Sequence, residues 1–166
     1  MLQIGLDGQE HARARLRPGC PAGGLLHLPL DPAVCRPADP HAEMLVVEAD
    51  GVRTTWTYRP DRELAGPRPE RTVEPAAVGG GLLVTVTAGT LLRDLCVFAD
   101  RLAAPLGLDP HELVVDDALV TLLPGERRTF RVTRRDGLPI TGQGGAALPG
   151  ADLLDVAVRS AGELTG

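Results

Sequence analysis

The sequence predicts an all-β protein made of β-sandwich domains, and two observations carry that prediction. Short runs alternate between apolar and polar residues, as half-buried strands do, and Asp-Gly or Pro-Gly pairs end several of these runs. In the clearest run, 81–88, Val84 and Val86 would face a core while Thr85 and Thr87 would face the other side. Strands and turns at this spacing are typical of an immunoglobulin-like sandwich.

Three further segments extend this pattern in the C-terminal half. The apolar spacing of Thr90–Phe98 fits a short helix as well as a strand, and the β-rich neighbourhood favours a strand. Val114–Leu123 is predicted as one strand that ends at the turn Pro124–Gly125. The alternation then resumes, with Phe130 and Val132 facing one way.

The N-terminal half predicts two hairpins, because an Asp-Gly pair supplies the positive φ angles of a type I′ turn. Such pairs stand at Asp7–Gly8 and Asp50–Gly51. The predicted strands are Leu2–Leu6, His11–Arg17, Leu25–Leu30, Met44–Ala49 and Val52–Tyr58. In the second of these, Leu16 would face inward. Asp31–Pro40 contains several prolines and is predicted as a turn-rich connection.

The proline and glycine residues of Ala65–Pro69 predict a domain boundary. We therefore expect a partial β-sandwich over 1–64, a C-terminal immunoglobulin-like sandwich over 65–134, and a Gly-rich tail over 135–166. Within that tail, Leu153–Val158 would pack back on the sheet as a final strand.

Composition and charge narrow the classes of partner. Of the 166 residues, 43% are hydrophobic, which is enough for a core, and the formal net charge is −5. Because that charge would repel a phosphate backbone, no nucleic-acid partner is expected. The N-terminus lacks the features of a signal peptide, and no apolar run reaches the length of a membrane span. We therefore expect a cytoplasmic protein with no membrane partner.

The number and spacing of the cysteine and histidine residues indicate no disulfide, metal site or cofactor. Cys20, Cys35 and Cys96 are odd in number, far apart and without a CxxC pair, so reduced thiols are expected. The histidines are scattered, at positions His11, His27, His41 and His111. None of them stands at metal-ligand spacing or in a nucleophile motif.

Several stretches resemble the C-terminal domains of family 2 β-mannosidases. Thr90–Leu95, Phe98–Leu102 and Asp116–Glu126 are similar to the last immunoglobulin-like domain of these enzymes, and Val156–Leu164 is similar to their terminal segment. Met1–Leu64 resembles the latter part of the preceding β-sandwich domain. If that domain begins before the position of Met1, the first sandwich lacks a strand and exposes a sheet edge that invites pairing with another chain.

The resemblance implies an accessory, structural role and no catalytic residue on this chain. The complete enzyme would hydrolyse terminal non-reducing β-D-mannose residues with retention, using two glutamates on a (β/α)₈ barrel that needs roughly 250 residues. The implied partners are that catalytic barrel and manno-oligosaccharides. A stand-alone carbohydrate-binding module and a protein-scaffolding sandwich are the alternatives.

Two residue pairs are candidates for a catalytic or a sugar-binding site. Asp116–Asp117 is a tempting carboxylate pair, but adjacent residues on a regular strand point to opposite faces and cannot converge on one bond. Trp56 and Tyr58 stand two apart and share a face, so they could contact a sugar. The favoured interpretation of both rings is a contact in the core or between domains.

Overall fold

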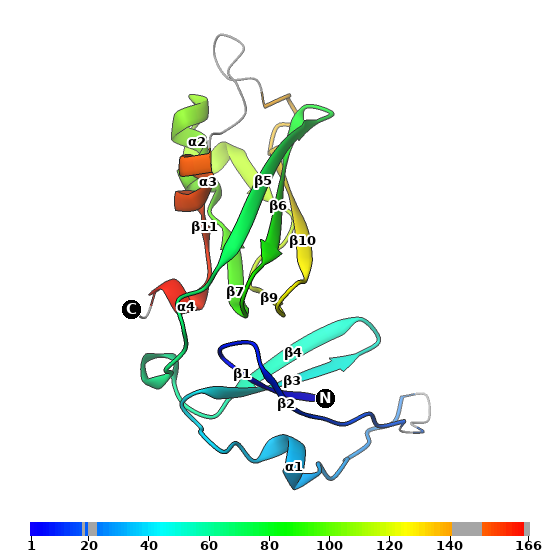
Figure 1. Cartoon of the computed structure of the whole chain (residues 1–166). Coiled ribbons are helices and arrows are strands. Elements are labelled where there is room, and N and C mark those ends of the chain that lie inside the picture. The colour runs from blue at the N-terminus through cyan, green and yellow to red at the C-terminus, as the bar shows by residue number, and fades with distance from the viewer. Residues whose placement is uncertain (18, 20–22, 141–150, 165–166) are drawn as a thin grey trace. The chain divides into compact units, whose positions relative to one another are not determined.

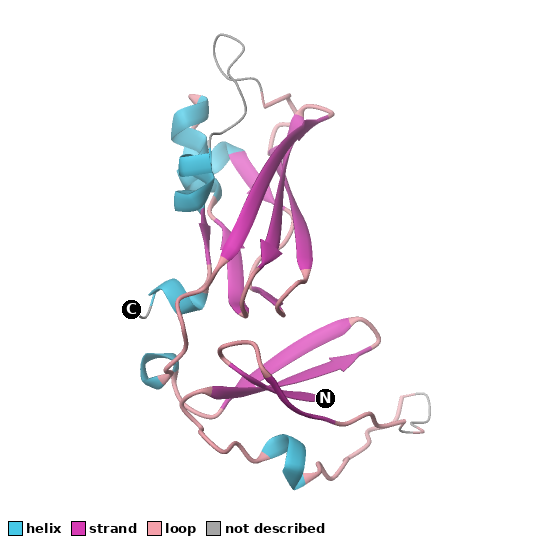
Figure 2. Ribbon diagram, viewed as in Figure 1, coloured by secondary structure: helices cyan, strands magenta, loops and turns pink. Residues whose placement is uncertain are grey.

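The computed structural model describes residues 1–17, 19, 23–140 and 151–164; of residues 151, 152 and 164 only the backbone is described. Strands in antiparallel sheets form most of the regular structure, and the helices are short (Figure 2). The all-β prediction is therefore confirmed. The chain divides into two compact units, unit 1 (Met1–Pro67) and unit 2 (Arg68–Gly166). The division falls inside the predicted connection Ala65–Pro69.

Unit 1 contains one antiparallel sheet with the strand order β2-β1-β3-β4 (Figure 1). Its strands are β1 (Leu2–Gly5), β2 (Glu10–Arg13), β3 (Glu43–Ala49) and β4 (Val52–Thr57). The turn between β3 and β4 has positive φ at both central residues, 49° at Asp50 and 79° at Gly51, as a type I′ turn requires. A short helix, α1 (Pro32–Cys35), and a 3₁₀ turn, η1 (Asp61–Glu63), complete the unit.

The two faces of the β1–β3 pair differ in chemistry. Leu2 lies opposite Val46 and Ile4 opposite Met44, and all four side chains are buried, so this face is apolar. Gln3 and Glu43 point to the other face and are buried as well. That face carries the polar cluster described below.

Two strand predictions in unit 1 are wrong. Leu25–Leu30 forms no strand, and its leucines are exposed, Leu25 by 85%. Pro29 has no N–H to donate to a ladder, and the segment pairs with none of the strands of the sheet. The predicted strand His11–Arg17 ends at Arg13, and Leu16 is 46% exposed instead of facing inward.

Unit 2 contains two antiparallel sheets, β5-β6-β10-β8 and β11-β7-β9. The strands are β5 (Arg71–Val78), β6 (Gly81–Ala88), β7 (Leu92–Val97), β8 (Leu113–Val115), β9 (Val120–Leu122), β10 (Arg127–Arg134) and β11 (Val158–Arg159). The helices are α2 (Ala99–Ala103), α3 (Ala151–Ala157) and α4 (Ala161–Leu164), with 3₁₀ turns η2 (Ala104–Leu106) and η3 (Pro110–Glu112).

One hydrophobic core joins the two sheets of unit 2. It contains Val84 and Phe130 from the first sheet and Leu92 from the second, all fully buried. Leu102 of α2 and Leu154 of α3 belong to the same core. The predicted inward positions in β6 and β10 are confirmed, because the even-numbered residues Leu82–Ala88 are buried and the odd-numbered ones are less so.

Two predictions in unit 2 need correction. Val114–Leu123 is not one strand, because the chain leaves the first sheet after Val115 and enters the second at Val120. Leu119, between these strands, has a φ of 57°, which breaks the extended conformation. Most of Leu153–Val158 is helical in α3, and only Val158 and Arg159 form a strand, beside β7. Part of the predicted Gly-rich tail, residues 141–150 and 165–166, lies outside the described residues.

Candidate functional site

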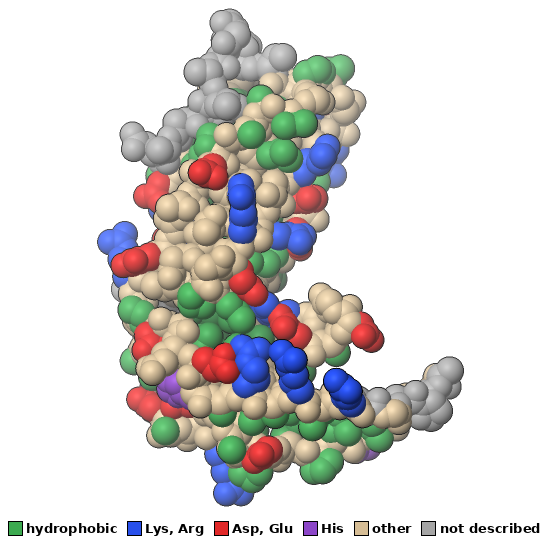
Figure 3. All heavy atoms as spheres, turned by 45° about the vertical axis from the view of Figure 1, so that its right-hand side comes forward, with side chains coloured by type: hydrophobic (Ala, Val, Ile, Leu, Met, Phe, Trp, Pro, Cys, Tyr) green, Lys and Arg blue, Asp and Glu red, His purple; other side chains and the backbone are tan. Residues whose placement is uncertain are grey.

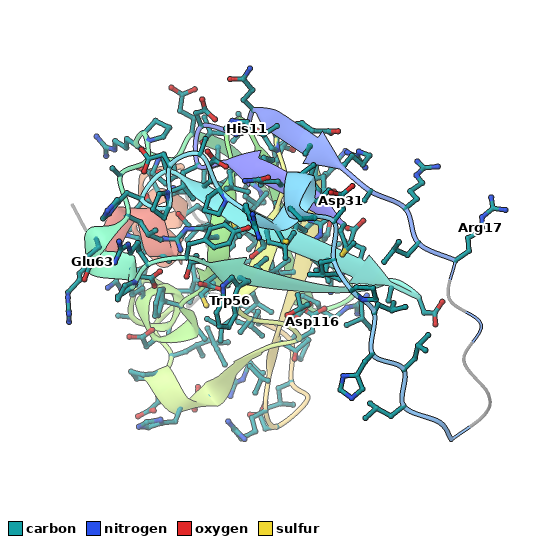
Figure 4. All side chains as sticks on the ribbon, turned by 90° about the horizontal axis from the view of Figure 1, so that it is seen from below. His11, Arg17, Asp31, Trp56, Glu63 and Asp116 are labelled. Carbon is teal, nitrogen blue, oxygen red and sulfur yellow. The ribbon has the colours of Figure 1, made fainter. Side chains whose placement is uncertain are left out.

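The strongest candidate site lies on unit 1 and contains Trp56 on β4 and the polar cluster around Glu43 on β3. Leu45 lies opposite Trp56, and by the same register Glu43 lies beside Tyr58, so these side chains share the polar face of the sheet. Trp56 and His11 come from the two edge strands, β4 and β2 (Figure 4).

Trp56 is 65% exposed, which corrects the interpretation of this ring as a core residue. Because β4 is an edge strand, the ring has a neighbouring strand on one side only. An exposed indole offers an apolar surface of the kind on which the faces of sugars pack. Trp56 is therefore available for a ligand or a partner.

Tyr58 behaves differently, although it shares a face with Trp56. Its hydroxyl oxygen is buried and has no hydrogen-bond partner among the described residues. Burial raises the pKa of this hydroxyl, and the nearby charges of Cys35 and Glu43 raise it further. The two rings therefore differ in exposure, since the indole is exposed whereas Tyr58 is half-buried with its hydroxyl oxygen inside.

Glu43 is the centre of the polar cluster and is only 2% exposed. Its Oε1 accepts hydrogen bonds from the backbone N–H groups of Ala38 (3.1 Å) and Asp39 (2.9 Å). Its Oε2 accepts a hydrogen bond from Nε2 of Gln3 and lies 3.4 Å from Nδ1 of His11. The carboxylate thus attaches the loop after α1 to the sheet, which explains why burying it is tolerated.

A glycine allows the histidine to reach this carboxylate. Gly5 lies opposite Glu43, and a Cβ atom at position 5 would lie 2.3 Å from Oδ1 of Asp7 and 3.2 Å from Nε2 of His11. A larger residue there would displace both side chains. The sequence analysis missed Glu43 and Gln3. Gln3 had a local signal, as a polar residue between the apolar residues Leu2 and Ile4, whereas Glu43 is the first residue of its strand and had none.

Asp116 and Asp117 have different partners, and the regular strand assumed for them is not present. Both residues lie in the connection between β8 and β9, not on a strand. Oδ1 of Asp116 accepts from the Arg131 N–H at 2.9 Å, whereas Oδ2 of Asp117 pairs with Arg128 at 2.5 Å. Each carboxylate has a structural partner on β10.

A second polar cluster, in unit 2, joins the C-terminal helix to β5. The guanidinium of Arg71 is 5% exposed and donates to Oε1 of Glu163 at 2.7 Å and to the Val158 carbonyl at 2.8 Å. Oε2 of Glu163 accepts from the Ser160 N–H at 2.8 Å. These residues border a cavity of about 300 Å³, lined by Arg68, Pro69, Glu70, Arg71, Asp155 and Glu163. Because the charges of Arg71 and Glu163 are paired with each other, we interpret this cluster as a structural link between α4 and β5 and call it the clamp.

Glu163 makes this clamp sensitive to acid. Burial alone would raise the pKa of Glu163, but the hydrogen bonds from Arg71 and Ser160 and the charges of Arg71 and Arg159 outweigh it and hold the pKa below the usual value of 4.5. The ionised carboxylate therefore stabilises unit 2 fully above that value, and the contribution is lost as the pH falls through the lowered pKa.

We predict that Glu163→Gln lowers the free energy of unfolding of unit 2 by roughly 1–3 kcal/mol at pH 7, because hydrogen bonds to a charged group are lost. The difference between variant and wild type should shrink below pH 4.5. Urea unfolding followed by far-UV circular dichroism measures both. The control is Asp155→Asn, whose 78% exposed side chain should contribute less than about 1 kcal/mol. If the difference in unfolding free energy between the two proteins stayed the same below pH 4.5, the ionised Glu163 carboxylate would not be its cause.

Elsewhere on the surface, many charged side chains lie near side chains of the opposite charge. On the face drawn in Figure 3, arginine and carboxylate side chains are interspersed. Exposed ion pairs join Arg13 to Glu10 and Arg53 to Glu48.

Within the described residues there is no group of three or more His, Cys, Asp or Glu side chains that could hold a metal. Cys35 and Cys96 are free thiols; Cys20 lies outside the described residues.

Comparison with protein-family models and with curated protein sequences finds no match for this chain. Among its described residues, none of the helices is long and apolar enough to cross a membrane.

Proposed function

We propose that this chain is a non-catalytic accessory region of a β-mannosidase-like glycoside hydrolase. The complete enzyme would remove terminal non-reducing β-D-mannose residues, and the chain would support its catalytic barrel. One observation carries the proposal: Thr90–Leu95 and Asp116–Glu126, which resemble the last domain of those enzymes, contribute the paired strands β7 and β9. Stretches that resemble one domain are thus neighbours in one compact unit.

The proposal includes an immunoglobulin-like sandwich for unit 2. Its support is the division into a four-stranded and a three-stranded sheet around one core, as in the constant-type immunoglobulin domain. The order departs from that domain in both sheets. There the fifth strand stands beside the second, whereas here the sixth strand of the unit, β10, stands beside β6, and β9 pairs with β7.

The carboxylates also favour an accessory role. Retaining glycosidases need two carboxyl groups roughly 5–5.5 Å apart, one of which attacks the sugar. Glu43, Asp116 and Asp117 are instead engaged by N–H groups or arginines of this chain. The proposed location is the cytoplasm, where the free thiols Cys35 and Cys96 would remain reduced.

The reading frame upstream of the Met1 codon tests this proposal. We expect it to continue through alternating strands and helices of a barrel that carries two glutamates, and we expect the isolated chain not to hydrolyse an aryl β-mannoside. An in-frame stop codon immediately upstream would overturn the assignment to a larger enzyme. Hydrolysis by the pure chain would overturn the non-catalytic role.

The exposure of Trp56 favours a second candidate, a carbohydrate-binding module. Since Trp56 is the single tryptophan, its fluorescence reports on a sugar bound there. A saturable change on titration with mannan that disappears in Trp56→Ala would favour this candidate. Unchanged fluorescence at millimolar sugar would remove it.

A further inference from the structure

β4 is an open edge of the sheet in unit 1. It pairs with β3 on one side, in a regular register from Met44–Thr57 to Ala49–Val52, and is the last strand in the sheet order. The strand contains no proline, lysine or bulge, the devices that usually protect an edge. Its outer N–H and C=O groups therefore pair with no further strand of that sheet.

The other edge strands of the described chain are protected. β2 pairs with β1 through a register shift and exposes Glu10 and Arg13. β5 contains Pro75, which cannot donate a backbone hydrogen bond. The remaining edges are short, since β8 and β9 have three residues each and β11 has two. This contrast singles out β4.

The side chains of β4 suit an apolar partner. Val52 and Trp56 are 70% and 65% exposed and lie on the same face, because their positions differ by an even number. Thr54 stands between them on that face. The single charged residue of the strand, Arg53, pairs with Glu48 of β3, so its charge is already compensated.

We propose that β4 pairs antiparallel with β4 of a second copy of this chain, about a two-fold axis at Thr54. In this arrangement Val52 of each copy lies opposite Trp56 of the other, and each covers an apolar side chain that is exposed in the single chain. Arg53 lies opposite Thr55 of the second copy on the other face. The interface is isologous, as in most homodimers.

The hydrogen-bond pattern fits this register. Ala49 and Val52 close the two-residue turn, so the N–H of Val52 points to β3, as do those of Thr54 and Trp56. The backbone groups of Arg53 and Thr55 then point outward and can exchange hydrogen bonds with Thr55 and Arg53 of the second copy. Val52 and Trp56 become non-hydrogen-bonded pairs, whose side chains approach most closely.

The two neighbouring registers would bring less favourable side-chain pairs together. A two-fold axis at Thr55 would place the indole of Trp56 opposite the polar side chain of Thr54. An axis at Arg53 would bring two arginines face to face, which is unfavourable. Only the axis at Thr54 pairs the two exposed apolar residues of the strand with each other.

Sedimentation equilibrium of the full chain over a range of concentrations is the first test. We expect a reversible dimer and, as it forms, a blue shift in the emission of the single tryptophan. Thr55→Pro removes an outward N–H and should abolish the dimer. Val78→Glu, at an exposed valine of the protected edge β5, is the control and should leave it intact. A wild-type monomer at every concentration, or a Thr55→Pro dimer, would overturn the proposal.

A mixing experiment tests the register. Val52→Glu and Trp56→Lys should each weaken self-association by roughly tenfold or more, because each removes two cross-strand pairs per dimer. A one-to-one mixture should associate again. Its heterodimer has one Glu–Lys pair and one native Val–Trp pair. Circular dichroism must show that both variants fold. Two folded variants that do not associate on mixing would exclude this register.

Sugar binding at Trp56 and pairing through β4 compete for the same ring. If mannan bound the indole, it would dissociate the dimer in the same sedimentation experiment. A dimer that mannan leaves unchanged supports pairing as the use of this ring. A wild-type monomer whose tryptophan fluorescence responds to mannan would replace the pairing proposal with the sugar site.

Discussion

Replacing Phe130 by alanine should lower the free energy of unfolding of unit 2 by roughly 3–5 kcal/mol, because the removed ring leaves a cavity that the core cannot fill. Phe130 lies on β10, which has β6 on one side and β8 on the other, and its side chain has no exposed surface. Small domains are stable by only about 5–15 kcal/mol, so the loss is a large part of the total.

The two units can be followed separately in this experiment. The single tryptophan lies in unit 1, so urea unfolding of unit 2 is measured by far-UV circular dichroism while Trp56 fluorescence reports on unit 1. Thr129→Ala is the control, because that exposed side chain makes only a 2.9 Å hydrogen bond to Thr85. It should cost less than about 1 kcal/mol. Equal losses for the two variants would contradict the assigned core.

Replacing Glu43 by alanine should destabilise unit 1 by roughly 3–5 kcal/mol. The N–H groups of Ala38 and Asp39 and the amide of Gln3 would lose their acceptor, and each buried donor without a partner costs about 1–3 kcal/mol. The loop after α1 would lose its attachment to the sheet. Trp56 fluorescence during urea unfolding measures the change.

Glu48→Ala is the matched control for Glu43. Glu48 belongs to the same strand, but its side chain is 55% exposed and its partner is Arg53, also on the surface. An exposed ion pair contributes about 0–1 kcal/mol, so this variant should unfold close to wild type. If Glu48→Ala were as destabilising as Glu43→Ala, burial would not be the reason for the effect.

The alternation of β6 shows what local pattern can predict. Val84 and Val86 face the core and Thr85 faces away, as expected, because side-chain direction on a strand depends only on position. The turn at Asp50–Gly51 was predicted for a similar reason, since positive φ at both positions is a property of the residue pair.

The candidate site was predicted only in part. Trp56 and Tyr58 were singled out and share a face, but their different exposure depends on which strands lie beside β4 and on what covers the sheet. Glu43 was missed, because a glutamate at the start of an apolar strand becomes a buried acceptor only through the donors of Ala38, Asp39 and Gln3 around it. The clamp of Arg71 and Glu163 joins residues 92 positions apart and has no local signal.

By itself, the sequence determined the antiparallel β class, the strands with regular alternation and the turn between β3 and β4. The tertiary structure alone decided that Val114–Leu123 crosses from one sheet to the other, that Leu153–Val158 is mostly helical, and that β4 is an open edge. The physical reason is the range of the forces. Turn geometry and strand alternation depend on neighbouring residues, whereas strand partners, burial and charge pairing depend on distant segments brought together by the fold.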